Sequence, residues 1–278
     1  MPELPEVETI SRHLRSALVG RRLVRVAILD ERLTRPEPPA SVARALEGER
    51  IVGVGRRGKY VVVDLESDRH LLVHLRMTGS FRTGVGGFLE DDPHLRAVAT
   101  LDDGSDVVYR DVRRFGTWHV LGGVELTSYL AARLGPEPLE RGFTAAALEA
   151  ILAERRAPVK AVLLDQRRLA GVGNIYADEA LWRAAVDPRR PAGTLGRAEV
   201  KALHRGIRAA LQAGIARQGA SLRDYRDPTG AEGTMQDEFR VYGRAGLPCL
   251  RCGTPIAKTR IAGRGTWFCP RCQAHLKP

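Results

Sequence analysis

The spacing of the four cysteines constrains the fold of this chain more than any other feature of its sequence. They form two Cys-x-x-Cys pairs, Cys249/Cys252 and Cys269/Cys272, with residues 253–268 between them. Four thiolates in this arrangement match a tetrahedral structural zinc site, in which no coordination position is left open for catalysis. The alternative, two disulfides, is typical of exported proteins, and the N-terminus has no apolar signal core. We therefore expect one structural Zn²⁺ held by the four cysteines.

The segment between the two cysteine pairs is basic and contains glycine. It predicts a hairpin whose tip, residues 258–266, could carry Arg264 to a phosphate. The whole chain has a formal net charge of +11 and a pI near 10.1. Arginine clearly outnumbers lysine, and its planar guanidinium suits bidentate contact with phosphate. A nucleic acid is the simplest partner for such a charge, although a basic surface that binds nothing would have the same composition.

The first part of the chain combines one helix with many short strands. Residues 5–18 have apolar side chains three and four positions apart, at Val7, Ile10, Leu14 and Leu18, which predicts an amphipathic helix. Turn residues separate the strand-like runs that follow, and this pattern is typical of an antiparallel sandwich or barrel. The predicted strands span residues 23–29, 51–54, 60–65, 70–75, 97–101, 107–110 and 117–121, and residues 83–93 are predicted to form an exposed loop.

The pattern becomes helical after Gly135-Pro136-Glu137-Pro138, which we interpret as a linker. Helices are predicted for residues 144–154, 158–166, 174–185 and 197–214. No run of about 18 apolar residues is present, so the sequence predicts no membrane-spanning helix. With no signal segment either, we expect a cytoplasmic protein.

The first residues carry the groups for amine chemistry. Removal of Met1 would leave Pro2 as a secondary amine with a pKa of roughly 7.7–8.0, which is partly unprotonated at neutral pH and can attack a carbonyl carbon. Glu3 and Glu6 place carboxyl groups close to that amine, where they could transfer protons. Prolines and acids are also common at an ordinary helix N-terminus, so composition alone leaves both interpretations open.

Other stretches combine basic, apolar and glycine residues near turns. The glycines at 171 and 173 precede a predicted helix at Asn174, which could bind an anion or simply begin the helix. Lys59 lies at a strand start, in a run that could equally be a solvated basic turn. An exposed Met77 or Phe115 could wedge between DNA bases while Arg113 fills the vacated place, although Met and Phe are more often core residues.

Taken in order along the chain, these stretches resemble the bacterial formamidopyrimidine-DNA glycosylase family. The resemblance covers nearly the whole chain and rests on seven groups of residues: 1–9, 59–60, 74–79, 111–116, 134–138, 171–177 and 241–244, together with the C-terminal cysteines. It implies an α+β multidomain fold: an antiparallel β-sandwich with an N-terminal helix (1–134), a helix–two-turn–helix DNA-binding domain (135–238) and a zinc finger (239–278). Double-stranded DNA would lie between the two main domains, bound by a monomer.

The resemblance also implies a repair enzyme that excises oxidised purines, such as 8-oxoguanine and formamidopyrimidines, and then cuts the strand by β,δ-elimination. Pro2 would be the nucleophile at the sugar C1′, Glu3 the proton donor and Glu6 a supporting acid. Lys59 is implied in β-elimination, and Arg264 in δ-elimination and phosphate binding. The family's DNA contacts fall on His74, His94, Arg113, Arg155, Lys160 and Asn174, and its intercalating residues on Met77, Arg113 and Phe115. The segment 221–234 matches a lesion-capping loop, and a lesion contact by Thr78 is left open because some members carry a larger polar residue there.

Two alternatives remain open at this point. A glycosylase of the endonuclease VIII type would use the same Pro2, Glu3 and Lys59 chemistry on oxidised pyrimidines. A zinc-containing protein that only binds damaged DNA would need none of the N-terminal chemistry. Preference among lesions separates the first alternative from our interpretation, and covalent trapping on lesion DNA separates the second.

Overall fold

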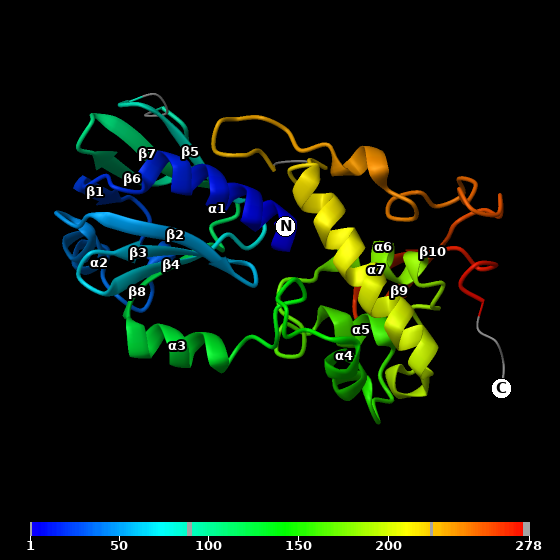
Figure 1. Ribbon diagram of the computed structural model, residues 1–278. Helices are drawn as coiled ribbons and strands as arrows, with labels where there is room; N and C mark the ends of the chain where they lie inside the picture. Colours follow the sequence, from blue (N-terminus) through cyan, green and yellow to red (C-terminus); the bar gives the residue numbers. More distant parts are fainter. Residues whose placement is uncertain (1, 88–90, 223–224, 275–278) are drawn as a thin grey trace. The chain divides into compact units, whose positions relative to one another are not determined.

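The structure is a computed structural model that describes residues 2–87, 91–222 and 225–274. The chain divides into two compact units, which we describe one at a time. The first unit combines residues 1–132 with residues 217–234, and the second combines residues 133–216 with residues 235–278. Figure 1 shows the elements of both units.

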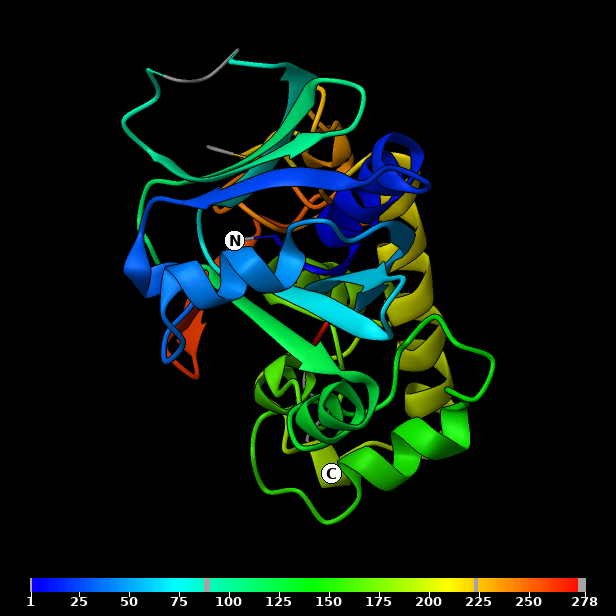
Figure 2. The same cartoon turned by 90° about the vertical axis from the view of Figure 1, so that its left-hand side faces the viewer.

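The first unit is built on two antiparallel sheets of four strands, seen as separate layers in Figure 2. One sheet has the strand order β1-β6-β7-β5, and the other has the order β2-β3-β4-β8. The strands span β1 Leu23–Ile28, β2 Ile51–Arg57, β3 Tyr60–Leu65, β4 Arg69–His74, β5 Gly79–Val85, β6 Leu95–Leu101, β7 Ser105–Asp111 and β8 Thr117–Gly122.

Alternation of buried and outward-facing residues explains why these strands pack face to face. Along β6, Leu95, Ala97, Ala99 and Leu101 are buried and the residues between them are partly exposed, as expected for a strand with one face in a core. Helix α1 (Leu4–Leu18) adds its apolar stripe to the same core. Its four predicted core residues are at most 4% exposed, so burial of this face accounts for the helix.

The sequence did not predict three elements of the first unit: helix α2 (Pro39–Leu46), strand β5 and helix α3 (Gly123–Ala131). The loop predicted for residues 83–93 is wrong at its start, because β5 continues to Val85. This strand contains two glycines and three polar residues, and it is held by pairing with β7 over its whole length. Tertiary pairing therefore overrides a weak local preference.

Residues 217–234 belong to the first unit although they follow the long helix α7 of the second. Figure 1 draws the part of this segment from residue 225 onward in gold beside β5. The Thr83 N–H donates to the Pro228 carbonyl oxygen over 3.1 Å, and the Arg82 guanidinium donates to the Asp227 carbonyl oxygen. The segment is therefore attached to the sandwich by main-chain bonds as well as by side chains.

The second unit is helical and ends in a hairpin. Its helices are α4 (Ala145–Leu152), α5 (Val159–Leu164), α6 (Asn174–Arg183) and α7 (Arg197–Ala216), and the hairpin strands are β9 (Ala257–Ile261) and β10 (Arg264–Phe268). Short 3-10 turns cover Glu31–Leu33 in the first unit and Ala192–Thr194 and Met235–Glu238 in the second. Within the described residues, no helix combines the length and the apolar character needed to cross a membrane.

The predicted fold class is confirmed: antiparallel sheets with an N-terminal helix in one part of the chain, and helices with a hairpin in the other. The division into domains 1–134, 135–238 and 239–278 stays a prediction. The boundary between the two compact units, after residue 132, lies within a few residues of the first predicted boundary. Residues 217–234, however, belong to the unit that contains the sandwich.

Candidate active site and metal centre

The N-terminal acids meet at the start of helix α1, which begins at Leu4. Pro2 is buried, and Glu3 and Glu6 are only 3% and 2% exposed. One carboxylate oxygen of Glu6 accepts the Glu3 backbone N–H over 2.8 Å. The chain end is therefore held against a buried carboxylate, and Met1 lies outside the described residues.

The other carboxylate oxygen of Glu6 binds a residue more than 200 positions away. It accepts the Ala220 backbone N–H over 2.8 Å. Gly219 has a positive φ of 84°, and a Cβ at this position would lie 2.7 Å from the Glu6 Cγ. Only glycine allows this close approach without strain. Glu6 thus links the N-terminus to the base of the predicted capping loop 221–234, of which residues 223–224 lie outside the described residues.

Lys59 and His74 lie at adjacent strand ends of the second sheet. Lys59 follows Gly58 in the tight turn between β2 and β3 and is 5% exposed. Burial, followed by the positive charges of Arg76 and Lys59, lowers the pKa of His74 to about 3. A neutral imidazole agrees with its Nδ1 accepting the Arg76 N–H over 3.0 Å. The structure therefore provides a buried lysine close to a neutral histidine.

The predicted intercalating residues occupy two segments joined to each other. Met77 lies between β4 and β5, and Arg113 and Phe115 lie between β7 and β8. Phe115 is 53% exposed, and the Arg113 guanidinium carbon lies 4.9 Å from the centre of its ring. His94 is partly exposed and its carbonyl oxygen accepts the Asp111 N–H over 2.9 Å, so it lies beside the same segment.

In the second unit, Arg264 begins strand β10 and is exposed. The turn before it, Ala262-Gly263, has both residues at positive φ, as in a two-residue type I′ hairpin. Asn174 is the first residue of α6, and its side-chain amide donates to the Gly265 carbonyl oxygen over 3.0 Å. Arg155 is exposed in the connection between α4 and α5.

Lys160 lies in a setting that the sequence did not predict. Its side chain is 0% exposed, and its ammonium lies 2.8 Å from an Asp178 carboxylate oxygen, 2.9 Å from the Gly265 carbonyl oxygen and 2.8 Å from the Thr266 hydroxyl. The ammonium thus donates hydrogen bonds to the Gly265 carbonyl and the Thr266 hydroxyl and forms an ion pair with the Asp178 carboxylate. The geometry argues against direct contact between this ammonium and DNA and makes it an anchor of the hairpin.

The four cysteines converge on one point. Their sulfur atoms lie within 4.8 Å of one another, and those of Cys252 and Cys269, one from each motif, are 3.5 Å apart. That distance is far beyond the roughly 2.05 Å of a disulfide and is close to the roughly 3.8 Å expected between ligands of a tetrahedral Zn–S site. Backbone N–H groups also point at the sulfurs, from Arg251 to Cys249 and from Cys272 to Cys269. The donor set therefore fits one structural zinc ion.

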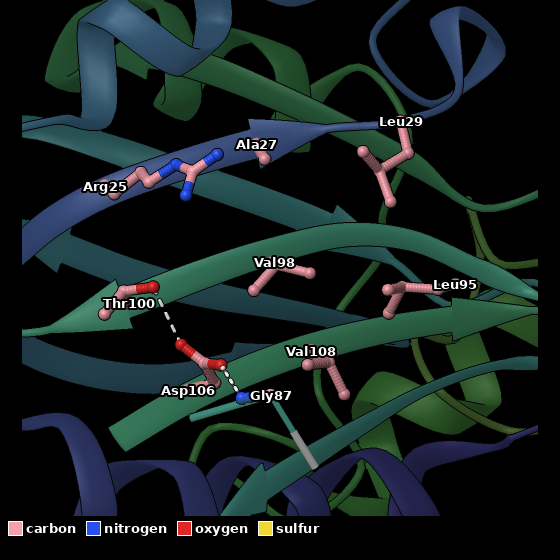
Figure 3. A pocket seen from close by; sticks show the side chains of 9 residues that line it. All are labelled: Arg25, Ala27, Leu29, Gly87, Leu95, Val98, Thr100, Asp106 and Val108. Carbon is pink, nitrogen blue, oxygen red and sulfur yellow. Dashed lines mark hydrogen bonds between the residues drawn. The ribbon is translucent and has the colours of Figure 1, made fainter. Parts of the chain in front are cut away.

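A separate hollow of about 250 Å³ lies on the face of the β1-β6-β7-β5 sheet that carries Arg25, Val98 and Val108 (Figure 3). Its centre is lined by aliphatic side chains, and the Asp106 carboxylate at its edge accepts the Thr100 hydroxyl over 2.7 Å and the Gly87 N–H over 2.8 Å. None of its nine lining residues is a predicted site residue. This hollow is not the candidate active site.

Several buried acids that shape these sites were missed by sequence reasoning. Asp111 and Asp178 each accept hydrogen bonds from segments that carry predicted site residues, and Glu179 accepts three backbone N–H groups at residues 240–242. Their only signal in the sequence was position: they lie inside, or directly after, the stretches 111–116 and 171–177.

Comparison with known proteins identifies the family. The formamidopyrimidine-DNA glycosylase N-terminal domain matches residues 1–118, the H2TH domain of the same glycosylase matches residues 134–226, and a zinc finger found in FPG and IleRS matches residues 246–274. The last match, together with the sulfur cluster, confirms the predicted zinc site.

Similar full-length proteins agree with these matches. A formamidopyrimidine-DNA glycosylase of Chloroflexus aggregans is 46% identical over 98% of both chains, and that of Symbiobacterium thermophilum is 48% identical over 98% of this chain and 89% of its own. Among solved structures, Lactococcus lactis Fpg in complex with DNA containing an abasic site has a TM-score of 0.91 at 36% identity and covers 98% of this chain and 100% of its own. The MutM (Fpg) protein of Thermus thermophilus has a TM-score of 0.87 at 44% identity, with 99% of both chains covered. This chain belongs to the formamidopyrimidine-DNA glycosylase family.

Proposed function

We propose that this protein is a bifunctional DNA glycosylase and abasic-site lyase that removes oxidised purines, chiefly 8-oxoguanine and formamidopyrimidines, from double-stranded DNA. The observation that carries the proposal is the N-terminal cluster, in which buried Pro2 and Glu3 adjoin a Glu6 carboxylate already bound on both oxygens. An amine held beside buried carboxyl groups has the parts for nucleophilic attack coupled to proton transfer.

In the proposed reaction, the target nucleotide leaves the base stack, because the sugar C1′ cannot be reached inside the duplex. The Pro2 nitrogen bonds to C1′ as the bond to the base breaks, and the base leaves with the proton that the amine loses. Glu3 then protonates the ring oxygen, so that the bond between C1′ and this oxygen breaks and an iminium ion forms. Glu6 orients the chain end through the Glu3 N–H.

The iminium ion then acts as an electron sink for strand cleavage. Loss of a C2′ proton, assigned to Lys59, expels the 3′ phosphate, and a second elimination, assigned to Arg264, expels the 5′ phosphate. Lys59 is only 5% exposed, and a lysine nitrogen accepts a proton only in its neutral form.

DNA binding is assigned to two sets of residues. In the first unit, His74, His94 and Arg113 contact the backbone, while Met77, Arg113 and Phe115 fill the gap left by the extruded nucleotide. In the second unit, Arg155 and Asn174 contact phosphates. Lys160 acts through the hairpin that it anchors, because its ammonium is fully buried and bonded within the protein. Cytoplasmic location and a monomeric state stay predictions.

Borohydride trapping tests the proposal. A duplex with one 8-oxoguanine is incubated with the protein and sodium cyanoborohydride, which reduces the imine to a stable adduct visible as a slower band. Pro2→Gly should lose most trapping, and Glu3→Gln most base excision. Measurement of the intact mass of the protein tests the expected removal of Met1.

Two control variants keep this test specific. Pro39→Gly changes a proline at the start of α2, and Glu8→Gln changes an acid of α1 that pairs with Arg12 and Arg56. Both should trap like the parent protein. Parent-like trapping by Pro2→Gly would overturn the mechanism, and faster cleavage of thymine glycol than of 8-oxoguanine would replace the substrate class by oxidised pyrimidines.

A further inference from the structure

Two segments carry the residues that we assign to the DNA wedge, and a single hydroxyl joins them. The Thr78 hydroxyl donates to an Asp111 carboxylate oxygen over 2.5 Å and accepts the Arg113 backbone N–H over 2.9 Å. Thr78 follows Met77 directly, and Arg113 is the wedge arginine itself. The hydroxyl therefore connects both parts of the wedge through its hydrogen and one of its lone pairs.

Asp111 extends this connection along the second segment. Its carboxylate is buried, and besides Thr78 it accepts the Arg113 N–H over 3.2 Å and, on its other oxygen, the Gly116 N–H over 2.8 Å. Both ends of the turn that presents Phe115 are thus bonded to one side chain. Charge-assisted bonds of this kind are stronger than neutral ones, so the turn is held in one shape.

The two segments also rest on the same buried phenol. A Cβ added at Gly79 would lie 2.2 Å from the Tyr109 hydroxyl oxygen, and one added at Gly116 would lie 1.9 Å from it. Tyr109 is 0% exposed and packs edge-on against Phe81 and Trp118 of the core. Neither segment can shift toward this phenol, because no space is left between the phenol and either glycine.

A further ion pair holds the outer side of the turn. Arg114 has a positive φ of 59°, and its guanidinium donates to both carboxylate oxygens of the nearly buried Asp30, over 2.5 and 2.9 Å. This bidentate pair leaves Arg113 and Phe115 on either side of a fixed residue. The only direct side-chain bond described between the Met77 segment and this turn is made by Thr78.

From this arrangement we propose that Thr78 is a positioning residue that couples the two segments, so that Met77, Arg113 and Phe115 enter the base stack as one rigid wedge. The inference rests on the proposed function, since it concerns how the wedge is held. It also assigns Thr78 a role within the protein: its hydrogen is directed to Asp111 and not to a damaged base.

The test compares Thr78→Val, which keeps the shape and removes the hydroxyl, with Thr78→Ser, which keeps the hydroxyl. Wedge entry is followed by the fluorescence of 2-aminopurine placed next to an 8-oxoguanine, and excision by single-turnover kinetics. Thr78→Val should slow both about tenfold, which corresponds to about 1.4 kcal/mol. Thr78→Ser should stay within about twofold of the parent protein.

A duplex with a preformed abasic site gives the second readout. No base has to be unpaired there, so strand cleavage depends less on the wedge, and Thr78→Val should cleave it within about twofold of the parent rate. Parent-like fluorescence and excision in Thr78→Val would overturn the inference, as would an equal loss in Thr78→Ser or an equal loss on both duplexes. If valine prevents folding, Thr78→Ala replaces it. A parent protein that traps neither duplex would refute the proposed function itself, which is a different outcome.

Discussion

Glu179 gives the sharpest quantitative prediction, because one buried carboxylate joins helix α6 to the chain that enters the zinc finger. Its side chain is 0% exposed. One of its oxygens accepts the backbone N–H groups of Arg240, Val241 and Tyr242 over 2.9, 3.0 and 3.1 Å, and the other accepts Arg183 over 2.8 Å. We predict that Glu179→Gln releases residues 240–242 while leaving the rest of the unit folded.

The magnitude follows from the change in charge. Hydrogen bonds to an ionised acceptor contribute about 1.5–3 kcal/mol and neutral ones about 0.5–1.5 kcal/mol. A neutral amide oxygen carries less negative charge than a carboxylate oxygen, so it holds the three N–H donors more weakly. Its NH₂ group also takes the place of the oxygen that accepts from Arg183. Together these losses amount to about 3 kcal/mol, which is roughly a hundredfold in an opening equilibrium.

Amide hydrogen exchange measures that equilibrium directly. Peptides covering residues 238–246 should lose about a hundredfold of protection in Glu179→Gln, because exchange of a protected amide reports local opening. Glu149→Gln is the matched control, since Glu149 is 45% exposed and its Oε1 lies 3.5 Å from the Nε of Arg197. Such surface ion pairs contribute at most about 1 kcal/mol to stability. Unchanged protection at residues 240–242 in Glu179→Gln would refute the reasoning.

Three further predictions concern acid, metal and the capping loop. The bond from Arg114 holds the pKa of Asp30 below its ordinary value. The pair therefore stabilises the fold above about pH 4, and this contribution is lost as the pH falls. The Tm of Asp30→Asn should be below that of the parent protein near neutral pH, and the two Tm values should converge in acid. Cys269→Ser, or zinc removal by a chelator, should lower bound zinc and DNA affinity while the circular dichroism of the β-sheets persists, and unchanged affinity would contradict this. Gly219→Ala should slow excision at least tenfold, because alanine is strained at this φ and its Cβ would displace Glu6. Single-turnover excision rates equal to those of the parent protein would count against a role for the contact between Gly219 and Glu6.

Much of the fold could be predicted because the decisive signals are local. Apolar spacing marked α1, and alternation between turn residues marked seven of the eight strands of the sandwich. Strand β5 was missed because glycines and polar residues interrupt its apolar pattern, and it forms through pairing with β7. Helix α3 has no buried residue, so it lacks the apolar face from which a helix is predicted.

The candidate site was predictable where its residues are neighbours in the chain. Pro2, Glu3 and Glu6 lie close together in the sequence at the start of α1, so the contact of Glu3 with Glu6 needed no knowledge of the fold. The contact of Glu6 with Ala220 could not be predicted, because the donor is a backbone N–H that every residue except proline has. The four cysteines are the opposite case, since only their side chains can bind the metal and their spacing was sufficient.

Lys160 shows why charge is a poor guide to contact. In a basic chain a lysine is expected at the surface, yet this one is fully buried with Asp178. Burial raises the pKa of Asp178 to about 7 even though Lys160 opposes that rise, which shows how much the interior disfavours a lone carboxylate there.

A buried ion pair of this kind contributes little to stability compared with apolar residues of the same volume, but it requires its partners in one geometry. Here the partners are the Gly265 carbonyl and the Thr266 hydroxyl, directly after Arg264, while Asp178 also accepts the Trp267 N–H over 3.1 Å. The pair therefore fixes the backbone of β10 against helices α5 and α6. Asn174 donates to the same Gly265 carbonyl. Asn174, which we assign to phosphate binding, and Arg264, which we assign to the last elimination, are therefore both held in place by the backbone that Lys160 fixes. We therefore predict that a change at Lys160 weakens DNA binding through both of these residues, although its own side chain has no access to solvent.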